Sequence, residues 1–386
     1  MFGFVSHRSA CEALRLLDGN EPRWPEQSRQ LPHKEGLILS QRDFARWERQ
    51  VDLAAHGIVS RPVDLLVFSK DQRRRGKRAH FHVWGGPVPA GSMVRLGEYL
   101  LVSGPELVII QHAGYQLKSR PLVKRFTRDL HAERDAMAFA GLDPHDAAFD
   151  HPWHWERTVR IVRLAMLVCE FCGTYRLAVG EGTPRYRVAP LTSKERIGQV
   201  LSQLDGVFGE RRVREALRLG FEGSASPMET ALVMMLTLPV EWGGFGLPRP
   251  QMNHAVNVRG LPYVPVSLEQ VTPDLLWEDR GQGHDVVLEY DSDEFHGVGD
   301  DVTAAARSRK AGEDAVRSNV LALKGFLCLR ATTEAMRSVG GVELLARQVA
   351  FGLGEKLREP NKVEALRRRR LFAILTGREA EEAGKL

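Results

Sequence analysis

Hydrophobic and polar positions alternate along several stretches of the first hundred residues, a pattern typical of β-strands. The three predicted strands are 63–68, 79–84 and 93–101. Apolar residues at helical spacing predict a helix at 41–55. Ser103 followed by Glu106 is the pattern of a helix cap and predicts that a helix begins there. Residues 1–125 are therefore expected to form a small α+β domain.

The pattern changes to helical spacing between residues 126 and 222. Apolar residues recur every three or four positions from Trp155 to Cys172, which predicts a long helix. Thr192 and Glu195 form a second capping pattern and predict another helix start. We therefore expect residues 126–222 to form a helical middle region.

Strong helix and strand signals return after residue 222. Ser226, followed by Pro227 and Glu229, predicts a capped helix. The elements expected after it are strands near 264, at 274–278 and at 285–291, a helix at 302–324 and a strand at 326–331. This order indicates a layered α/β unit, which we place at 223–357. The basic tail at 358–386 is expected to form an exposed helix, and the fold class is predicted to be α/β, α+β overall.

Length and composition bound the class of protein. The chain has 386 residues, 43% hydrophobic and 27% charged, which fits a globular protein with two or three domains. No run of about 18 uncharged apolar residues is present, so no membrane contact is expected. The N-terminus lacks a signal-peptide pattern, and four cysteines do not make a disulfide framework. These features predict a cytoplasmic protein.

Charge is distributed unevenly along the chain. The net charge is +5, yet ten acidic residues and one basic residue lie between Asp274 and Asp301. Such a concentration of carboxylates is costly to fold unless a cation lies among them. Basic residues cluster in four runs, at 73–78, 120–128, 307–310 and 367–370. These runs are either solvated faces or a surface that follows the phosphates of a nucleic acid.

Three carboxylates of the acidic segment are expected to converge. Glu289 and Asp291 are two positions apart on a predicted strand, so their side chains point to the same face. Asp274 begins the preceding strand and falls beside them if the two strands pair as a hairpin. Oxygen ligands of this kind suit Mg²⁺, Mn²⁺ or Ca²⁺, which can polarise a phosphate and activate water. An acidic surface hairpin without a metal is the alternative.

The same residues resemble a known family. Pro273-Asp274, a hairpin and Glu289-Tyr-Asp291 are similar to the core of the PD-(D/E)xK, or restriction-endonuclease-like, nuclease superfamily. The subgroup near very-short-patch-repair endonucleases also carries a nearby histidine, an Asp-x-x-Arg on the next helix and a glycine before the last strand. The matching positions here are His296, Asp314, Arg317, Leu321, Gly325 and Arg330, and the match spans residues 226–336.

The resemblance implies roles for individual residues. Asp274, Glu289 and Asp291 would be catalytic and would ligate Mg²⁺ or Mn²⁺. Glu229, on the first helix of the matched segment, would lie near the metal. The alternative is that Glu229 is only a helix-capping residue. His296 would act as a base or hold a phosphate, or is an ordinary loop histidine.

One position departs from the family pattern. The lysine that normally follows the glutamate by two residues is Asp291 here, so the site is either a variant or inactive. Lys310 is the predicted substitute, since positions 310, 314, 317 and 321 share one helix face. Lys310 paired with Asp314 on the surface is the alternative. Arg309 and Arg317 are expected to contact the substrate phosphate.

The N-terminal half carries a second resemblance. Phe81-His-Val and the stretch from Tyr99 to Leu107 resemble a region of abortive-infection type IV antitoxins, which are often fused to nucleases of this type in bacteria. The expected function is that of a bacterial, Mg²⁺-dependent DNA endonuclease in defence, acting on double-stranded DNA as a homodimer or with a partner from a defence or toxin–antitoxin operon. The alternatives are a non-catalytic, antitoxin-like nucleic-acid-binding regulator with a degenerate nuclease fold, and a module whose acidic face binds a basic partner.

Overall fold

The structure of the chain is a computed structural model. It describes residues 3–19, 38, 40–73, 75–115, 152–204, 206–262, 264, 267–278, 281, 283–291 and 304–377, with only the backbone at 115, 152–156 and 304–311. The described residues divide into two compact units, one up to Pro227 and one from Met228 onward. Both units combine helices with mixed β-sheets, which confirms the predicted α/β class.

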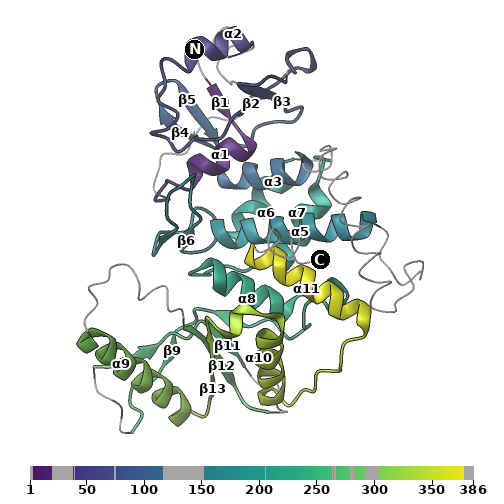
Figure 1. The fold of residues 1–386 in the computed structure, drawn as a ribbon. Coiled ribbons are helices and arrows are strands. Elements are labelled where there is room, and N and C mark those ends of the chain that lie inside the picture. The colour runs from purple at the N-terminus through teal and green to yellow at the C-terminus, as the bar shows by residue number, and fades with distance from the viewer. Residues whose placement is uncertain are drawn as a thin grey trace. The chain divides into compact units, whose positions relative to one another are not determined.

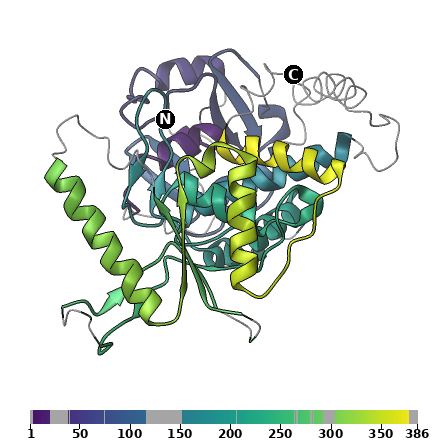
Figure 2. The same ribbon diagram turned by 60° about the horizontal axis from the view of Figure 1, so that its bottom comes forward.

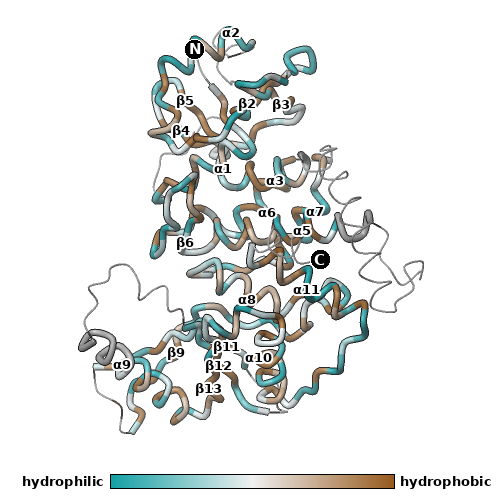
Figure 3. Tube along the Cα trace, viewed as in Figure 1, coloured by the Kyte–Doolittle hydropathy of each residue, from teal (hydrophilic) through white to brown (hydrophobic). Residues whose placement is uncertain are grey.

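The first unit contains a five-stranded sheet (Figure 1). Its strands are β1 (Gly3–Val5), β2 (Val63–Val67), β3 (Ala79–Val83), β4 (Met93–Gly97) and β5 (Leu100–Ser103), in the spatial order β3-β2-β1-β5-β4. β1 runs parallel to β5, and β2 runs parallel to β3. All residues of β1, β2 and β5 are buried, and the trace of β5 is mostly brown, the hydrophobic end of the scale, in Figure 3.

Helices cover this sheet and extend the same unit. α1 (His7–Leu14) and α3 (Pro105–Tyr115) pack against the strands and against each other. α3 also contacts α5 (Pro152–Phe171), α6 (Lys194–Ser202) and α7 (Glu210–Leu219), so the helices predicted for the middle region belong to the first unit. β6 (Tyr175–Arg176) and β7 (Arg185–Tyr186) form a short ribbon after α5.

Three sequence predictions in this unit differ from the structure. The single strand predicted at 93–101 is a hairpin, because the chain turns at Glu98 and Tyr99 between β4 and β5. Ser103 ends a strand instead of capping a helix, and α3 begins at Pro105. α2 (Gln41–Trp47) ends well before residue 55: the chain turns at 48–50, and the Asp52 carboxylate accepts a hydrogen bond from the Ala55 N–H at 3.1 Å.

The second unit is built on a four-stranded sheet in the order β13-β12-β11-β8. Its elements in chain order are α8 (Pro227–Thr237), β8 (Gln251–Met252), β11 (Leu275–Trp277), β12 (Val286–Asp291), α9 (Ala304–Leu323), β13 (Leu327–Thr332) and α10 (Val339–Gly352). β8, β11 and β12 are antiparallel neighbours, and α9 crosses over so that β13 runs parallel to β12. Figures 1 and 2 show α9 and α10 on opposite sides of this sheet.

One face of the sheet packs against α9. Leu276 of β11 and Val287 of β12 are register partners and form a buried cluster with Val320 and Leu321 of α9. β9 (Val256–Asn257) and β10 (Gln270–Val271) form a separate two-stranded ribbon that adds to this cluster. Residue 264, where a strand was predicted, lies between these two strands and belongs to neither.

The C-terminal helix differs from its prediction. α11 (Lys362–Thr376) is a helix, but it is not exposed: its last turns are buried, and it contacts α10 and the short 3-10 helix η5 (Val240–Trp242). Within its basic run, Arg368 is only 5% exposed, pairs with Glu343 at 3.2 Å and stacks on the Phe245 ring at 4.1 Å. The apolar residues 371–375 are buried. Because the basic run lies on the same helix, part of it is buried with them.

None of the helices described is long and apolar enough to cross a membrane. The four cysteines, Cys11, Cys169, Cys172 and Cys328, are free thiols, and the first three are buried.

Candidate functional site

The carboxylates predicted as the site lie where the α9 face of the second sheet changes from apolar to acidic. Side chains alternate along a strand, so Glu289 and Asp291 share the face of Val287. By the same alternation Asp274 shares the face of Leu276, and the β11–β12 register places it opposite Glu289. The hydrophobic cluster under α9 thus continues directly into the three carboxylates.

Asp274 is held by the neighbouring strand. Its Oδ2 accepts a hydrogen bond of 2.6 Å from the Tyr290 backbone N–H, while its own carbonyl accepts one from the Asn253 N–H at 2.9 Å. Burial raises the pKa of Asp274 to about 7, and the charge of Glu229 adds to the rise. The Tyr290 N–H and the Arg317 guanidinium oppose it. Near neutral pH the Asp274 carboxyl is therefore partly protonated, and a metal ion can take the place of its proton.

Glu289 carries an unsatisfied oxygen. Its Oε1 is buried and makes no hydrogen bond, and the closest described cation is Arg317, whose Nη2 lies 3.6 Å away. Burial raises the pKa of Glu289, while Arg317 acts in the opposite direction. Arg317 itself is fixed by donating to the Thr272 carbonyl at 2.9 Å. A buried carboxylate oxygen without a donor is a position where a metal ion would be stabilised.

Asp291 lies at the more exposed end of the site. Its Oδ2 is 3.4 Å from Nη1 of Arg330, which comes from the parallel strand β13. Both side chains are about two-fifths exposed, so this ion pair contributes little to stability. The pair does, however, bring the Arg330 guanidinium next to Asp291, the position that holds a lysine in the nucleases that this segment resembles.

Glu229 lies close to these strands although it comes from α8. Its side chain is 7% exposed, and its Oε2 accepts from Nδ2 of Asn253 at 3.3 Å. Its charge is the largest single charge that raises the pKa of Asp274. Glu229 is therefore near Asp274.

Three predicted residues lie wholly or partly outside the described part of the structure. His296 lies outside the described residues. Lys310 and Arg309 lie on α9, but their side chains are outside the described part of the structure. Asp314 and Arg317, one and two turns further along, are partly buried, and both act on the pKa of Glu289. The face of α9 that carries Arg317 and Leu321 is therefore the face turned to the sheet.

The donor set of this site consists of carboxylate oxygens, which suits Mg²⁺ or Mn²⁺. Among the described residues, Asp274, Glu289, Asp291 and Glu229 do not supply three ligand atoms within 4.8 Å of one another. Mg²⁺ usually keeps several waters and takes one or two carboxylates together with substrate phosphates. Among the residues that the structure describes, these carboxylates therefore do not form a closed protein cage.

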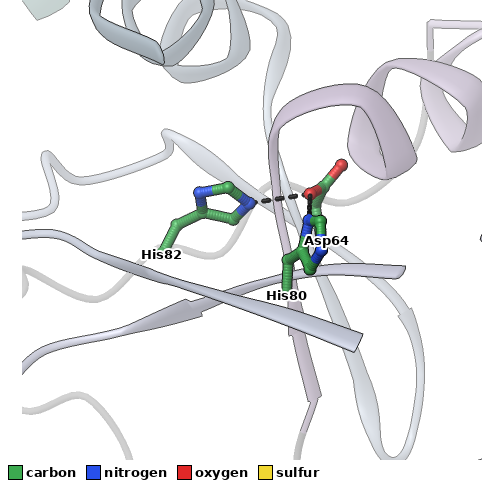
Figure 4. Close-up of side chains that lie close together, drawn as sticks. All are labelled: Asp64, His80 and His82. Atoms are coloured by element: carbon green, nitrogen blue, oxygen red, sulfur yellow. Dashed lines mark hydrogen bonds and ion pairs between the residues drawn. The ribbon is translucent and has the colours of Figure 1, made fainter. Parts of the chain in front are cut away.

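A second group of metal-binding side chains was not predicted. Asp64 of β2 and His80 and His82 of β3 have ligand atoms that all lie within 4.8 Å of one another, so the group can hold a metal ion (Figure 4). The pattern His-x-His on a strand was visible in the sequence and places both rings on one face. Asp64 lies sixteen positions before His80, and only the strand order brings it to them.

Arg8 and Arg75 provide the charge around this second group. Burial lowers the pKa of His80, the Asp64 carboxylate raises it, and both arginines lower it further. The net lowering of the His80 pKa favours the neutral imidazole, the form that binds metals.

Comparisons with protein-family models, with curated proteins and with solved structures give no match to this chain.

Proposed function

We propose that the second unit is a metal-dependent endonuclease of the PD-(D/E)xK type that hydrolyses phosphodiester bonds in DNA, in bacterial defence. The observation that carries the proposal is the buried Oε1 of Glu289, which has no hydrogen-bond donor and faces the same side of the sheet as Asp274. Support also comes from the order of a helix, three mutually antiparallel strands, a crossover helix and a parallel strand in this sheet.

The residues of the site have distinct tasks in this proposal. Asp274 and Glu289 would hold Mg²⁺ or Mn²⁺, and Glu229 would reinforce the negative potential around Asp274. A divalent ion at this place polarises a phosphate and activates water. Arg317, anchored to the Thr272 carbonyl, presents a guanidinium beside Glu289, where it can hold a phosphate oxygen.

The test is cleavage of DNA by the full chain with Mg²⁺ or Mn²⁺ and with a chelator. Asp274→Ala and Glu289→Ala should each lower the rate by orders of magnitude, because they remove the groups that hold the ion. Glu278→Ala is the matched control and should cut like wild type, because Glu278 is exposed and directly follows β11, at the opposite end from Asp274. Wild-type protein that cuts neither double-stranded nor single-stranded DNA nor RNA would exclude the enzyme.

A second experiment identifies the cation that replaces the family lysine. Arg330 already lies 3.4 Å from Asp291, whereas Lys310 is a candidate from its helix position alone. The variant that loses cleavage while keeping DNA binding, Arg330→Ala or Lys310→Ala, identifies the group used in the transition state. Because a guanidinium stays protonated, Arg330 would stabilise charge and orient water without acting as a base. Wild-type rates in both variants would assign the task to neither residue.

The alternative proposal is a nucleic-acid-binding regulator without catalytic activity. Its specific support is that Glu289 and Asp291 each have an arginine within 4 Å, so part of their charge is already balanced by the protein. It predicts DNA binding that is unchanged by chelator and by Asp274→Ala. Metal-dependent cleavage that disappears in Asp274→Ala would exclude it.

A further inference from the structure

We propose that Asp64, His80 and His82 bind one divalent transition-metal ion of the zinc class in the first unit. The site shares no residue with the carboxylate site of the second unit and does not depend on the proposed nuclease activity.

The three ligand atoms are already close together. His82 Nε2 is 2.7 Å and His80 Nδ1 is 3.9 Å from the same oxygen, Oδ1 of Asp64. Figure 4 shows the two rings and the carboxylate turned toward one another. A tetrahedral ion with bonds of about 2.0–2.1 Å separates its ligand atoms by about 3.3 Å. Small side-chain rotations that insert the ion between His82 and Asp64 therefore suffice.

The backbone fixes where these side chains start. β2 and β3 are parallel neighbours with Asp64 opposite His80, and His82 is two residues further on the same face. The Asp64 N–H donates to Ser9 Oγ at 3.0 Å, and the Asp64 carbonyl accepts from the Ser6 N–H at 2.9 Å. These two hydrogen bonds connect the start of α1 to the backbone of Asp64, so they fix the position from which the Asp64 carboxylate projects.

His7 restricts the ring of His82. The two imidazole rings stack with centroids 4.0 Å apart and an angle of 31° between their planes. His7 Nδ1 lies 2.9 Å from Ser6 Oγ, so the stacking ring is itself anchored. A preset ring orientation lowers the entropy cost of ordering the ligands around an ion. His7 is thus a positioning residue for the site.

The donor set selects the class of metal. Two imidazole nitrogens and one carboxylate oxygen suit Zn²⁺ and its neighbours among the transition metals, whereas Mg²⁺ and Ca²⁺ require mainly oxygen.

The site is closed on one side and open on the other. Asp64 is 5% exposed, whereas the His80 side chain is 29% exposed on the edge strand of the sheet. Three protein ligands with an open fourth position are typical of zinc sites that bind water or an external ligand. Purely structural zinc sites usually have four protein ligands.

The proposal is tested with the full chain, prepared without a histidine tag and freed of metal. Zn²⁺ is added, the protein is desalted and the bound metal is counted by elemental analysis; Co²⁺ in a parallel sample reports the coordination by its visible absorption. Wild type should retain one equivalent of zinc and give a four-coordinate cobalt spectrum. His80→Ala and His82→Ala should each bind Zn²⁺ at least about tenfold more weakly.

Two controls separate this site from other metal binding. His56→Ala removes another histidine of the first unit and should bind zinc like wild type. Circular dichroism verifies that His80→Ala keeps its fold, which is expected because His80 lies on an edge strand. Wild type that retains no zinc, zinc retained equally in His80→Ala and His82→Ala, or loss of zinc when equimolar Mg²⁺ is added would each overturn the proposal.

Discussion

Replacing Asp274 by asparagine should stabilise the metal-free protein at neutral pH while removing metal-dependent activity. The folded state raises the pKa of Asp274 from 3.8 to about 7, so ionising it costs folding free energy. The stability associated with the protonated acid is fully present below pH 4 and is lost as the pH rises through 7. Asparagine retains an oxygen for the Tyr290 N–H but carries no charge.

The size of the effect follows from the pKa shift. A shift of about three units at about 1.4 kcal/mol per unit gives about 4 kcal/mol at pH 8 and almost nothing at pH 4. For a unit of about 150 residues, 1 kcal/mol moves the melting temperature by about 2–4 °C. The melting temperature of Asp274→Asn relative to wild type should therefore rise by about 10 °C between pH 4.5 and pH 8.

The assay is differential scanning calorimetry in a chelating buffer across this pH range. Glu278→Gln is the matched control, because it neutralises an exposed carboxylate that follows the other end of β11 and should show no comparable trend. Added Mg²⁺ should raise the melting temperature of wild type and leave Asp274→Asn unchanged. A melting-temperature difference between Asp274→Asn and wild type that stays constant from pH 4.5 to pH 8 would refute the raised pKa of Asp274.

Three further predictions concern other parts of the chain. Arg368→Ala should destabilise the protein by about 2 kcal/mol in urea unfolding, because it removes the buried side chain that stacks on Phe245 and one of the two arginines paired with Glu343, whereas the exposed Arg369→Ala should change stability by less than about 0.5 kcal/mol. Burial lowers the pKa of His112 to about 4, so wild type should lose about 3 kcal/mol relative to His112→Asn as the pH falls from 6.5 to 4, measured by urea unfolding at each pH. If the run at 73–78 follows phosphates, neutralising it should reduce the slope of log affinity against log salt by about one unit per lost contact, and an unchanged slope would return it to the status of a solvated face.

The sequence by itself determined most of the local structure of the second unit. The period of two in 285–291 places Val287, Glu289 and Asp291 on one face, and the structure has a strand there. The capping pattern at Ser226 predicted the start of α8, and the glycine at 325 predicted the end of α9. These features depend on interactions within a few residues, which a sequence displays directly.

The tertiary structure alone decided what surrounds the candidate sites. Arg330 reaches Asp291 because β13 returns parallel to β12, and Asp64 meets His82 because β2 and β3 are neighbours in the sheet. Part of the basic run at 367–370 is buried, because Arg368 stacks on the ring of Phe245, which lies in a loop more than a hundred residues earlier. Strand order, burial and pKa are set by contacts between distant segments, whereas periodicity and capping reflect only the local chain.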